Sequence, residues 1–164
     1  MSALPSASVE SHAHRLAKKL MAGWLRQTAS ETGRDGHADF CGIGWRVNRP
    51  PPHFGIWLEY PFADLPSITD VWDERSERWS SRPPTYAELA ALNLRPRAIV
   101  DIAVQHKGRI AWAIEIVHKH PVDEAKLDFL RTRTDLTLIE IPAYWVLGQV
   151  DRPSEIPPEF FLTW

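Results

Sequence analysis

The sequence has little cysteine and no long apolar run. Its single cysteine, Cys41, excludes an internal disulfide and any zinc site built from several cysteines. No apolar run approaches the roughly 20 residues that a membrane-spanning helix needs, so we expect no membrane association. Residues 1–19 lack the apolar segment of a secretion signal, and the cytoplasm is therefore the expected compartment.

Net positive charge is also missing. The chain has 19 Lys and Arg against 21 Asp and Glu, a net charge of −2, so no global positive field indicates a nucleic-acid partner. A local basic patch would still be sufficient for one. What is abundant is tryptophan and proline, with 8 and 14 residues. The tryptophans offer large areas for burial, and the prolines favour long ordered loops over a helical bundle.

The apolar periodicity predicts one α/β domain over residues 1–164. We expect helices at 11–28 and 122–134, and strands at 43–47, 54–60, 137–141 and in a hairpin within 95–122. The order strand, helix, strand after the hairpin implies a parallel crossover. We interpret 61–96 as an insertion, and 1–10 and 150–164 as loose termini.

Two apolar runs flank a short turn at His106–Arg109 and predict the β-hairpin. One strand has a bulky set of Val100, Ile102 and Val104, and the other has Ile110, Trp112, Ile114 and Ile116. If both sets face one core, Asp101 and Glu115 share the opposite face. That parity needs an odd loop such as Lys107–Arg109, because a two-residue Lys107-Gly108 turn would separate the carboxylates. Their Cβ atoms would then lie roughly 5–8 Å apart.

Two carboxylates this close repel each other unless a cation lies between them. Mg²⁺ binds one or two carboxylates together with waters and phosphate oxygens. Asp101 and Glu115 are therefore candidate ligands for Mg²⁺ or Mn²⁺. Glu59 is either a third acid at the metal or an ordinary edge residue. From the hairpin alone, two solvated acids on an exposed sheet face remain the alternative.

Several short motifs occur in a fixed order along the chain. They are Arg97, Asp101, Ile102 and Ala103 in the first hairpin strand, and Ala113, Ile114, Glu115 and Ile116 in the second. Upstream, His14 and Lys18 have an H-x-x-x-K spacing, and Glu59 lies in an apolar strand. This combination is similar to the PD-(D/E)XK phosphodiesterase superfamily and most resembles its competence-associated CoiA-like branch. The resemblance covers residues 11–28, 54–60 and 97–147.

The resemblance implies a restriction-endonuclease-like core, a mixed β-sheet flanked by helices. It implies a metal-dependent nuclease that hydrolyses nucleic-acid phosphodiester bonds, with DNA as the expected substrate. Asp101 and Glu115 would be the catalytic metal ligands. The residues expected to contact nucleic acid are His14, Lys18, Arg97 and His118.

The chain departs from the family pattern at the catalytic lysine. Lysine is expected two residues after Glu115, where this chain has Val117. Lys126, in the following helix, is slightly favoured over Lys119 as the replacement that orients water and stabilises charge on the phosphate. If neither reaches the site, the domain is a catalytically inactive module that binds nucleic acid or protein. A homodimer that pools the basic residues of the first helix would help a mildly acidic chain to hold a polyanion.

Other side chains have weaker signals. His118 and His120 would face one side of a continued strand, where they either ligate Zn²⁺ or Mn²⁺ with a carboxylate or are simply exposed. Glu140 interrupts an apolar strand and is expected to pair with a basic residue. Trp72 and Trp79 either stack on single-stranded bases, pack in the core or form a protein interface.

Overall fold

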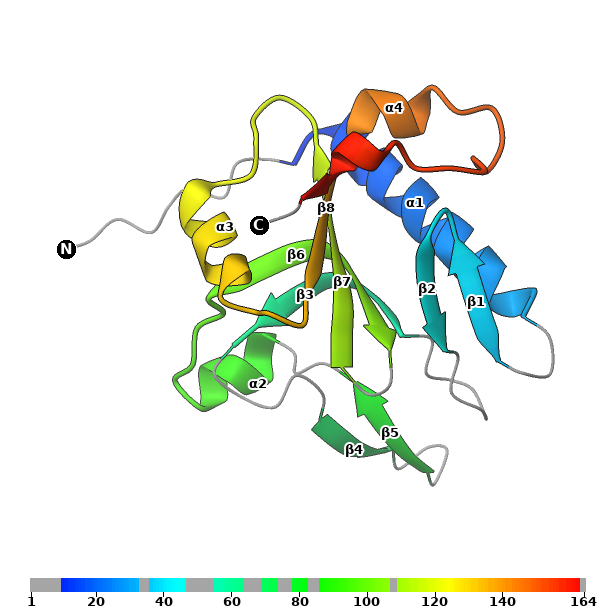
Figure 1. Cartoon of the computed structure of the whole chain (residues 1–164). Helices are drawn as coiled ribbons and strands as arrows, with labels where there is room; N and C mark the ends of the chain where they lie inside the picture. Colours follow the sequence, from blue (N-terminus) through cyan, green and yellow to red (C-terminus); the bar gives the residue numbers. More distant parts are fainter. Residues whose placement is uncertain are drawn as a thin grey trace.

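The computed structural model describes residues 10–32, 36–46, 55–63, 69–73, 78–82, 86–106 and 109–162 (Figure 1). The helices are α1 (His12–Ser30), α2 (Tyr86–Ala91), α3 (Glu124–Arg131), α4 (Ala143–Leu147) and a short 3-10 turn, η1 (Pro158–Phe160). The strands are β1 (His37–Phe40), β2 (Ile43–Arg46), β3 (Ile56–Phe62), β4 (Thr69–Asp73), β5 (Arg78–Arg82), β6 (Ala98–His106), β7 (Arg109–Val117), β8 (Thr137–Pro142) and β9 (Phe161–Leu162).

The centre of the molecule is a five-stranded mixed sheet in the order β3-β6-β7-β8-β9. Only β7 and β8 pair in parallel, and α3 connects them, so the predicted parallel crossover is confirmed. The other pairs in this sheet are antiparallel. Two separate ribbons, β1–β2 and β4–β5, complete the strands of the described residues. The expectation of an α/β domain with a mixed sheet and flanking helices is therefore confirmed.

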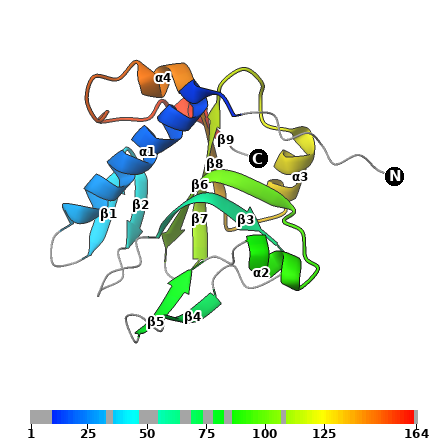
Figure 2. The same cartoon turned by 180° about the vertical axis from the view of Figure 1, so that it is seen from behind.

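The helices form layers on the two faces of this sheet. Figures 1 and 2 show α1 and α4 on one side and α3 on the other. A buried cluster on the first side joins α1, α4 and the β1–β2 ribbon to Ile102, Ile114 and Ile139. A second cluster joins Leu127 and Leu130 of α3 to the opposite face of the sheet. The sheet is consequently buried from both sides.

Helix α1 forms where its sequence signals place it. The Ser11 hydroxyl accepts a hydrogen bond from the His14 backbone N–H at 3.1 Å, which caps the first turn. Ala17, Met21 and Leu25 recur at one-turn spacing and are fully buried against the sheet. The expected helix at 11–28 is therefore confirmed. Within the described residues, no helix has both the length and the apolar character that crossing a bilayer would require.

The hairpin reaches its register by a different route from the one expected. His106 pairs with Arg109, so only two residues lie between the paired ends, and the predicted odd loop is wrong. Val104 pairs with Trp112 while Gln105 pairs with Ile110, which makes Ala111 an extra residue, a β-bulge. The bulge supplies the odd residue that the turn lacks. The bulge in β7, rather than the turn, therefore determines which side chains of β7 after Ala111 point to each face of the sheet.

The predicted single apolar face of the hairpin is also wrong in part. Ile102 and Ile114 pack on the α1 side, whereas Val100 and Ile110 belong to the cluster on the α3 side. The change at Ile110 follows from the bulge. The change between Val100 and Ile102 occurs at Asp101, opposite Glu59 of β3.

Strands also form in segments for which none was predicted. β1 follows α1 and pairs with β2 through a tight turn at Cys41-Gly42, both with positive φ. The expected loose tail contains β9, whose Phe161 pairs with Ile139. The expected insertion at 61–96 contains β4, β5 and α2, while β3 continues into it as far as Phe62. Residues 1–9 of the expected loose N-terminus lie outside the described part of the chain.

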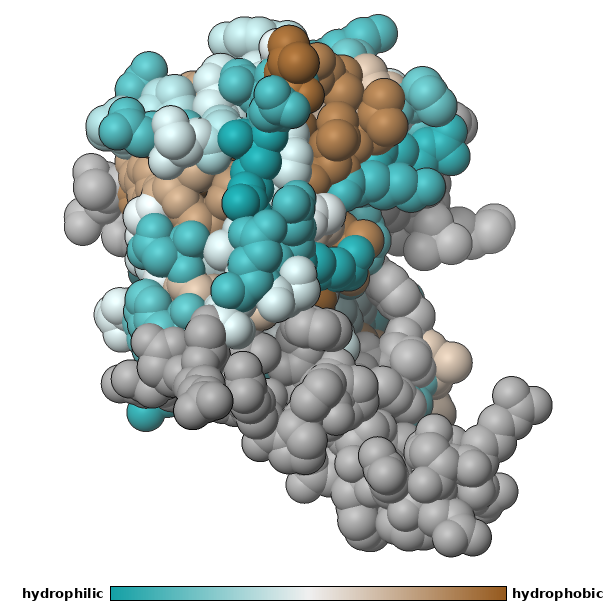
Figure 3. All heavy atoms as spheres, turned by 90° about the vertical axis from the view of Figure 1, so that its right-hand side faces the viewer, coloured by the Kyte–Doolittle hydropathy of each residue, from teal (hydrophilic) through white to brown (hydrophobic). Residues whose placement is uncertain are grey.

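One face of the surface is mixed in character. Figure 3 shows the side of the molecule that lies at the right of Figure 1. Hydrophobic residues gather in two areas of its upper half, with hydrophilic residues between them. The part of this face that the structure describes therefore has no continuous apolar surface. The candidate functional site lies among polar side chains at the central sheet.

Candidate functional site at the divergence of β6 and β7

Asp101 and Glu115 lie opposite each other where two central strands part. The pairing of Ile102 with Ile114 sets a register that places Asp101 across from Glu115, as predicted. Beyond this point β6 continues along β3, and β7 continues along β8. The Ile116 backbone N–H donates to Asp101 Oδ2 at 2.8 Å. At this point a side chain of β6, rather than its backbone, accepts the hydrogen bond from β7. Both acids are buried, with exposed fractions of 8% and 4%.

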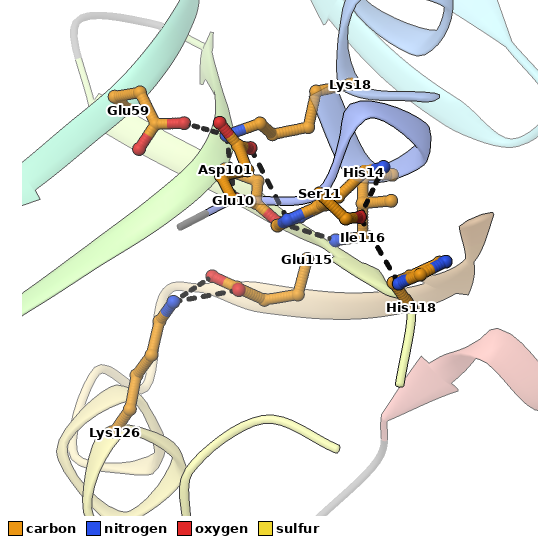
Figure 4. Close-up of polar contacts among 10 residues, drawn as sticks. All are labelled: Glu10, Ser11, His14, Lys18, Glu59, Asp101, Glu115, Ile116, His118 and Lys126. Atoms are coloured by element: carbon orange, nitrogen blue, oxygen red, sulfur yellow. Dashed lines mark hydrogen bonds and ion pairs between the residues drawn. The ribbon is translucent and has the colours of Figure 1, made fainter. Parts of the chain in front are cut away.

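The two carboxylates take their partners from opposite layers. Asp101 Oδ2 lies 3.0 Å from His14 Nε2, and Asp101 Oδ1 lies 3.4 Å from Lys18 Nζ, both on α1. Glu115 instead contacts Lys126 of α3. Figure 4 shows Asp101 among the α1 side chains and Glu115 directed toward Lys126. The two carboxylates are therefore directed to opposite layers, and the prediction that Asp101 and Glu115 share one face of the sheet is wrong.

Lys18 is the centre of the α1 side of the site. Its Nζ forms ion pairs with Glu10 and Glu59 in addition to Asp101 (Figure 4). Lys18 is only 6% exposed. Burial by itself lowers the pKa of this ammonium, but hydrogen bonds to Glu10 and Glu59 and the nearby charge of Asp101 outweigh it and raise the pKa above its usual value. Carboxylates from three separate segments thus converge on one cation.

Glu59 reaches this cluster through an unusual backbone conformation. Its φ is +51°, in the left-handed region that residues with a Cβ seldom occupy. The flanking pairs Leu58–Ile102 and Tyr60–Val100 place Glu59 opposite Asp101. Such outliers cost about 1–3 kcal/mol and tend to occur at functional sites. Glu59 therefore lies opposite Asp101, and its role as a third acid at a metal stays a prediction.

Glu115 and Lys126 form the α3 side of the site. Lys126 Nζ lies 2.7 Å from Oε1 and donates to Oε2 at 2.8 Å. Lys126 lies in the first turn of α3, which the Asp123 side chain caps by accepting from the Ala125 N–H at 3.1 Å. Burial raises the pKa of Glu115 to about 7; the Asp101 charge adds to the rise, and Lys126 opposes it. The site therefore holds a carboxyl group that titrates near neutral pH.

The structure separates the two lysine candidates. Lys126 contacts Glu115, whereas Lys119 is exposed after the end of β7 and contacts no carboxylate among the described residues. Val117, at the position where lysine was expected, pairs with Pro142 of β8. The choice of Lys126 over Lys119 thus agrees with the contacts.

The remaining predicted residues lie at differing distances from the centre. His118 Nδ1 lies 3.3 Å from the hydroxyl of Ser11, the cap of α1. Arg97 is exposed at the start of β6, and its backbone N–H donates to Phe62 O at 2.7 Å. β7 ends at Val117, before His118 and His120. The prediction that a continued strand places both histidines on one side, as a zinc pair needs, is therefore wrong.

Sequence reasoning missed two acids near the site. Glu10 contacts Lys18, but a single acid before a helix carries no signal for this role. Glu140 pairs in register with Glu115 on the parallel strand β8, and burial raises its pKa. The basic partner expected for Glu140 is absent among the residues that the structure describes. The available signal was the place of Glu140 in the apolar run TLIEI, but this pattern predicts an ion pair rather than a position beside Glu115.

Two further predictions concern the tryptophans at 72 and 79 and the metal site. The side chains of Trp72 and Trp79 lie outside the described set, although the backbones pair with each other across β4 and β5. Within the described part of the chain, no group of three or more His, Cys, Asp or Glu is arranged to hold a metal ion. In this arrangement Lys18 and Lys126 provide the positive charge beside the acids.

A scan against protein-family models gives no match, and comparisons with curated proteins and with solved structures give none either.

Proposed function

We propose that this domain is a metal-dependent nuclease that hydrolyses phosphodiester bonds in nucleic acid, with DNA as the first substrate to test. The observation that carries the proposal is the joint position of Asp101, Glu115 and Lys126. Two buried carboxylates occupy opposite positions on diverging strands, and a lysine ammonium contacts one of them. Paired acids with an adjacent cation are the groups that hydrolysis of a phosphodiester requires.

The donor set fits a hard divalent cation such as Mg²⁺ or Mn²⁺. Asp101 and Glu115 are both buried at opposite strand positions, and the charge of Asp101 adds to the rise in the pKa of Glu115 that burial causes. Asp101 and Glu115 would hold the ion, with Glu59 beside them. When bound, such an ion lowers the pKa of a coordinated water and offsets charge on the phosphate.

The side chains of the protein have separate roles in this proposal. Lys126 holds Glu115 in place and presents an ammonium group toward the space where a phosphate oxygen would develop charge. His14, at 3.0 Å from Asp101, orients that carboxylate. The Ile116 backbone N–H donates to Asp101 Oδ2, the same oxygen that His14 contacts, and so also holds this carboxylate in place. Together these contacts keep the acids preorganised before substrate binds.

A cleavage assay tests the proposal directly. Purified protein with Mg²⁺ or Mn²⁺ is incubated with labelled duplex DNA, single-stranded DNA and RNA. We expect cutting of at least one substrate, and loss of about 100-fold or more in rate for Asp101→Asn and for Glu115→Gln. Glu155→Gln, an exposed carboxylate outside the site, is the matched control. Equal cutting by Asp101→Asn and the unsubstituted protein would remove Asp101 from the mechanism.

A second candidate is a nuclease-like domain that binds nucleic acid or protein without cutting. It is favoured by the ion pairs of Lys18 and Lys126, which already neutralise the acids, and by Val117 in the place of the expected lysine. Calorimetric titration with Mn²⁺ separates the two candidates. Binding heat that Glu115→Ala abolishes supports the nuclease, whereas no heat in either protein supports the binding module.

A further inference from the structure

Helix α1 carries a stripe of basic side chains on its solvent face. His12, Arg15, Lys19 and Arg26 are all exposed. Steps of three, four and seven residues place them on one side of the helix. The residues that pack against the sheet lie on the other side. At 1.5 Å per residue, the stripe is about 21 Å long.

The charge of α1 is opposite to that of the rest of the chain. Its 19 residues include Arg15, Lys18, Lys19 and Arg26 but no Asp or Glu. The other 145 residues carry 15 Lys and Arg against 21 Asp and Glu, a net charge of −6. α1 is therefore the place where a polyanion can approach a chain whose total charge is −2.

Neither internal pairing nor helix stability explains the stripe. Among the described residues, Arg15, Lys19 and Arg26 form no ion pair with a carboxylate. Arg15 also lies in the first turn of α1, where the helix dipole disfavours a cation. The three side chains are consequently unpaired within the described chain and available to a partner.

We propose that the stripe of His12, Arg15, Lys19 and Arg26 binds the phosphate backbone of nucleic acid and guides it to the Asp101–Glu115 site. The inference rests on the proposed nuclease function and adds the surface that holds the substrate. The same helix directs His14 and Lys18 to Asp101, so one rigid element carries both the stripe and part of the site. Its length of about 21 Å corresponds to roughly six base steps at 3.4 Å each.

An anionic membrane fits this surface less well. Binding at a membrane interface needs an apolar face beside the basic one. Leu16, 43% exposed, is the only large apolar side chain of α1 with substantial exposure. The others face the core, as Met21 and Leu25 do. A stripe of cations without an apolar face matches a phosphate backbone.

Fluorescence anisotropy with labelled duplex and single-stranded oligonucleotides, without divalent cations, tests the inference. The triple variant Arg15→Gln, Lys19→Gln, Arg26→Gln removes three charges from the stripe. We expect it to bind at least about tenfold more weakly at low salt, and the slope of log K against log salt to fall by about 2–3. Lys19→Gln alone should lower that slope by about 1.

A matched triple variant, Arg95→Gln, Arg109→Gln, Arg131→Gln, removes the same charge from exposed positions outside α1. We expect its affinity and salt slope to stay close to those of the unsubstituted protein. Equal weakening by both triples would overturn the inference in favour of diffuse attraction. An unchanged slope in the stripe triple would also overturn it. So would loss of binding to phosphatidylserine vesicles with oligonucleotide affinity retained.

Cleavage assays on the same proteins separate this inference from the proposed function. If the unsubstituted protein cuts and the stripe triple cuts with the same KM, the stripe is wrong and the nuclease stands. If oligonucleotide binding depends on the stripe but no cutting occurs with Mg²⁺ or Mn²⁺, the stripe stands and the nuclease is wrong. If the protein neither binds an oligonucleotide nor cuts one with Mg²⁺ or Mn²⁺, both are wrong.

Discussion

Lys126 Nζ contacts both carboxylate oxygens of Glu115, at 2.7 and 2.8 Å, across the interface between α3 and β7. Glu115 is almost fully buried, whereas the Lys126 side chain retains 22% exposure. β7 has valine at position 117, where a lysine was expected, and α3 supplies the cation for Glu115 instead. This contact holds Glu115 in its orientation and opposes the rise in its pKa that burial causes.

Removal of Lys126 should leave an uncompensated buried acid. We expect Lys126→Met to lower the free energy of unfolding by about 1–3 kcal/mol at pH 8, because a buried charge without its partner is costly. Urea denaturation measures the change. Lys119→Met, an exposed lysine, should change stability by no more than about 0.5 kcal/mol. The double variant Glu115→Gln, Lys126→Met should recover most of the loss. A double variant as unstable as Lys126→Met would contradict an effect through Glu115.

Glu115 should also make stability depend on pH. Its pKa is about 7 in the folded protein against 4.5 for an unperturbed glutamate. Between these values the folded state binds more protons than the unfolded state, so stability falls as pH rises from 4.5 through 7. We expect Glu115→Gln to remove on the order of 1–3 kcal/mol of this fall. Denaturation at pH 5, 6, 7 and 8 measures it.

The control for the pH effect is Glu155→Gln, which changes an exposed acid. Its stability profile should parallel that of the unsubstituted protein. Identical slopes in Glu115→Gln and the unsubstituted protein would show that Glu115 titrates in its normal range.

Local sequence patterns predicted the elements that carry the site. The apolar stripe of α1, the alternation in β6 and β7 and the crossover through α3 follow from short-range periodicity, and each is present. Lys126 was accessible to prediction because α3 had to return along β7, which brings its first turn near Glu115. The hairpin predicted that Asp101 and Glu115 lie at neighbouring positions on two paired strands, but the parity argument that put them on one face fails.

The bulge at Ala111 and the tail could not be predicted in the same way. A bulge depends on how both strands pack, and nothing in the residues around Ala111 identifies it. β9 has only two residues and depends on the edge of β8, which is formed from residues more than 20 positions earlier. Glu10 precedes α1 and contacts Lys18, eight positions further along the chain, a spacing that no helical pattern indicates. Each is a tertiary effect.

Lys18 occupies the point toward which Glu10, Glu59 and Asp101 converge, and it should therefore compete with a metal ion there. We expect Lys18→Met to bind Mn²⁺ roughly three- to tenfold more tightly than the unsubstituted protein, because the acids lose their internal cation. Calorimetric titration measures the affinity. Mn²⁺ should also raise the melting temperature of this variant more strongly, since metal relieves repulsion among the acids.

Lys19→Met is the matched control for Lys18, because Lys19 is the adjacent lysine of α1 and is exposed. Its Mn²⁺ affinity should equal that of the unsubstituted protein. Weaker Mn²⁺ binding by Lys18→Met would mean that Lys18 supports the ion-binding arrangement rather than opposing it.

The positive φ of Glu59 gives a test that separates backbone strain from side-chain contacts. At +51° a Cβ is disfavoured, whereas glycine adopts this conformation freely. Glu59→Ala and Glu59→Gly both lose the contact with Lys18, so only the backbone differs between them. We expect Glu59→Gly to be the more stable of the two by about 1 kcal/mol, in urea denaturation. At Leu58, which lacks positive φ, the order should reverse, with alanine more stable than glycine. The same order at both positions would contradict strain at Glu59.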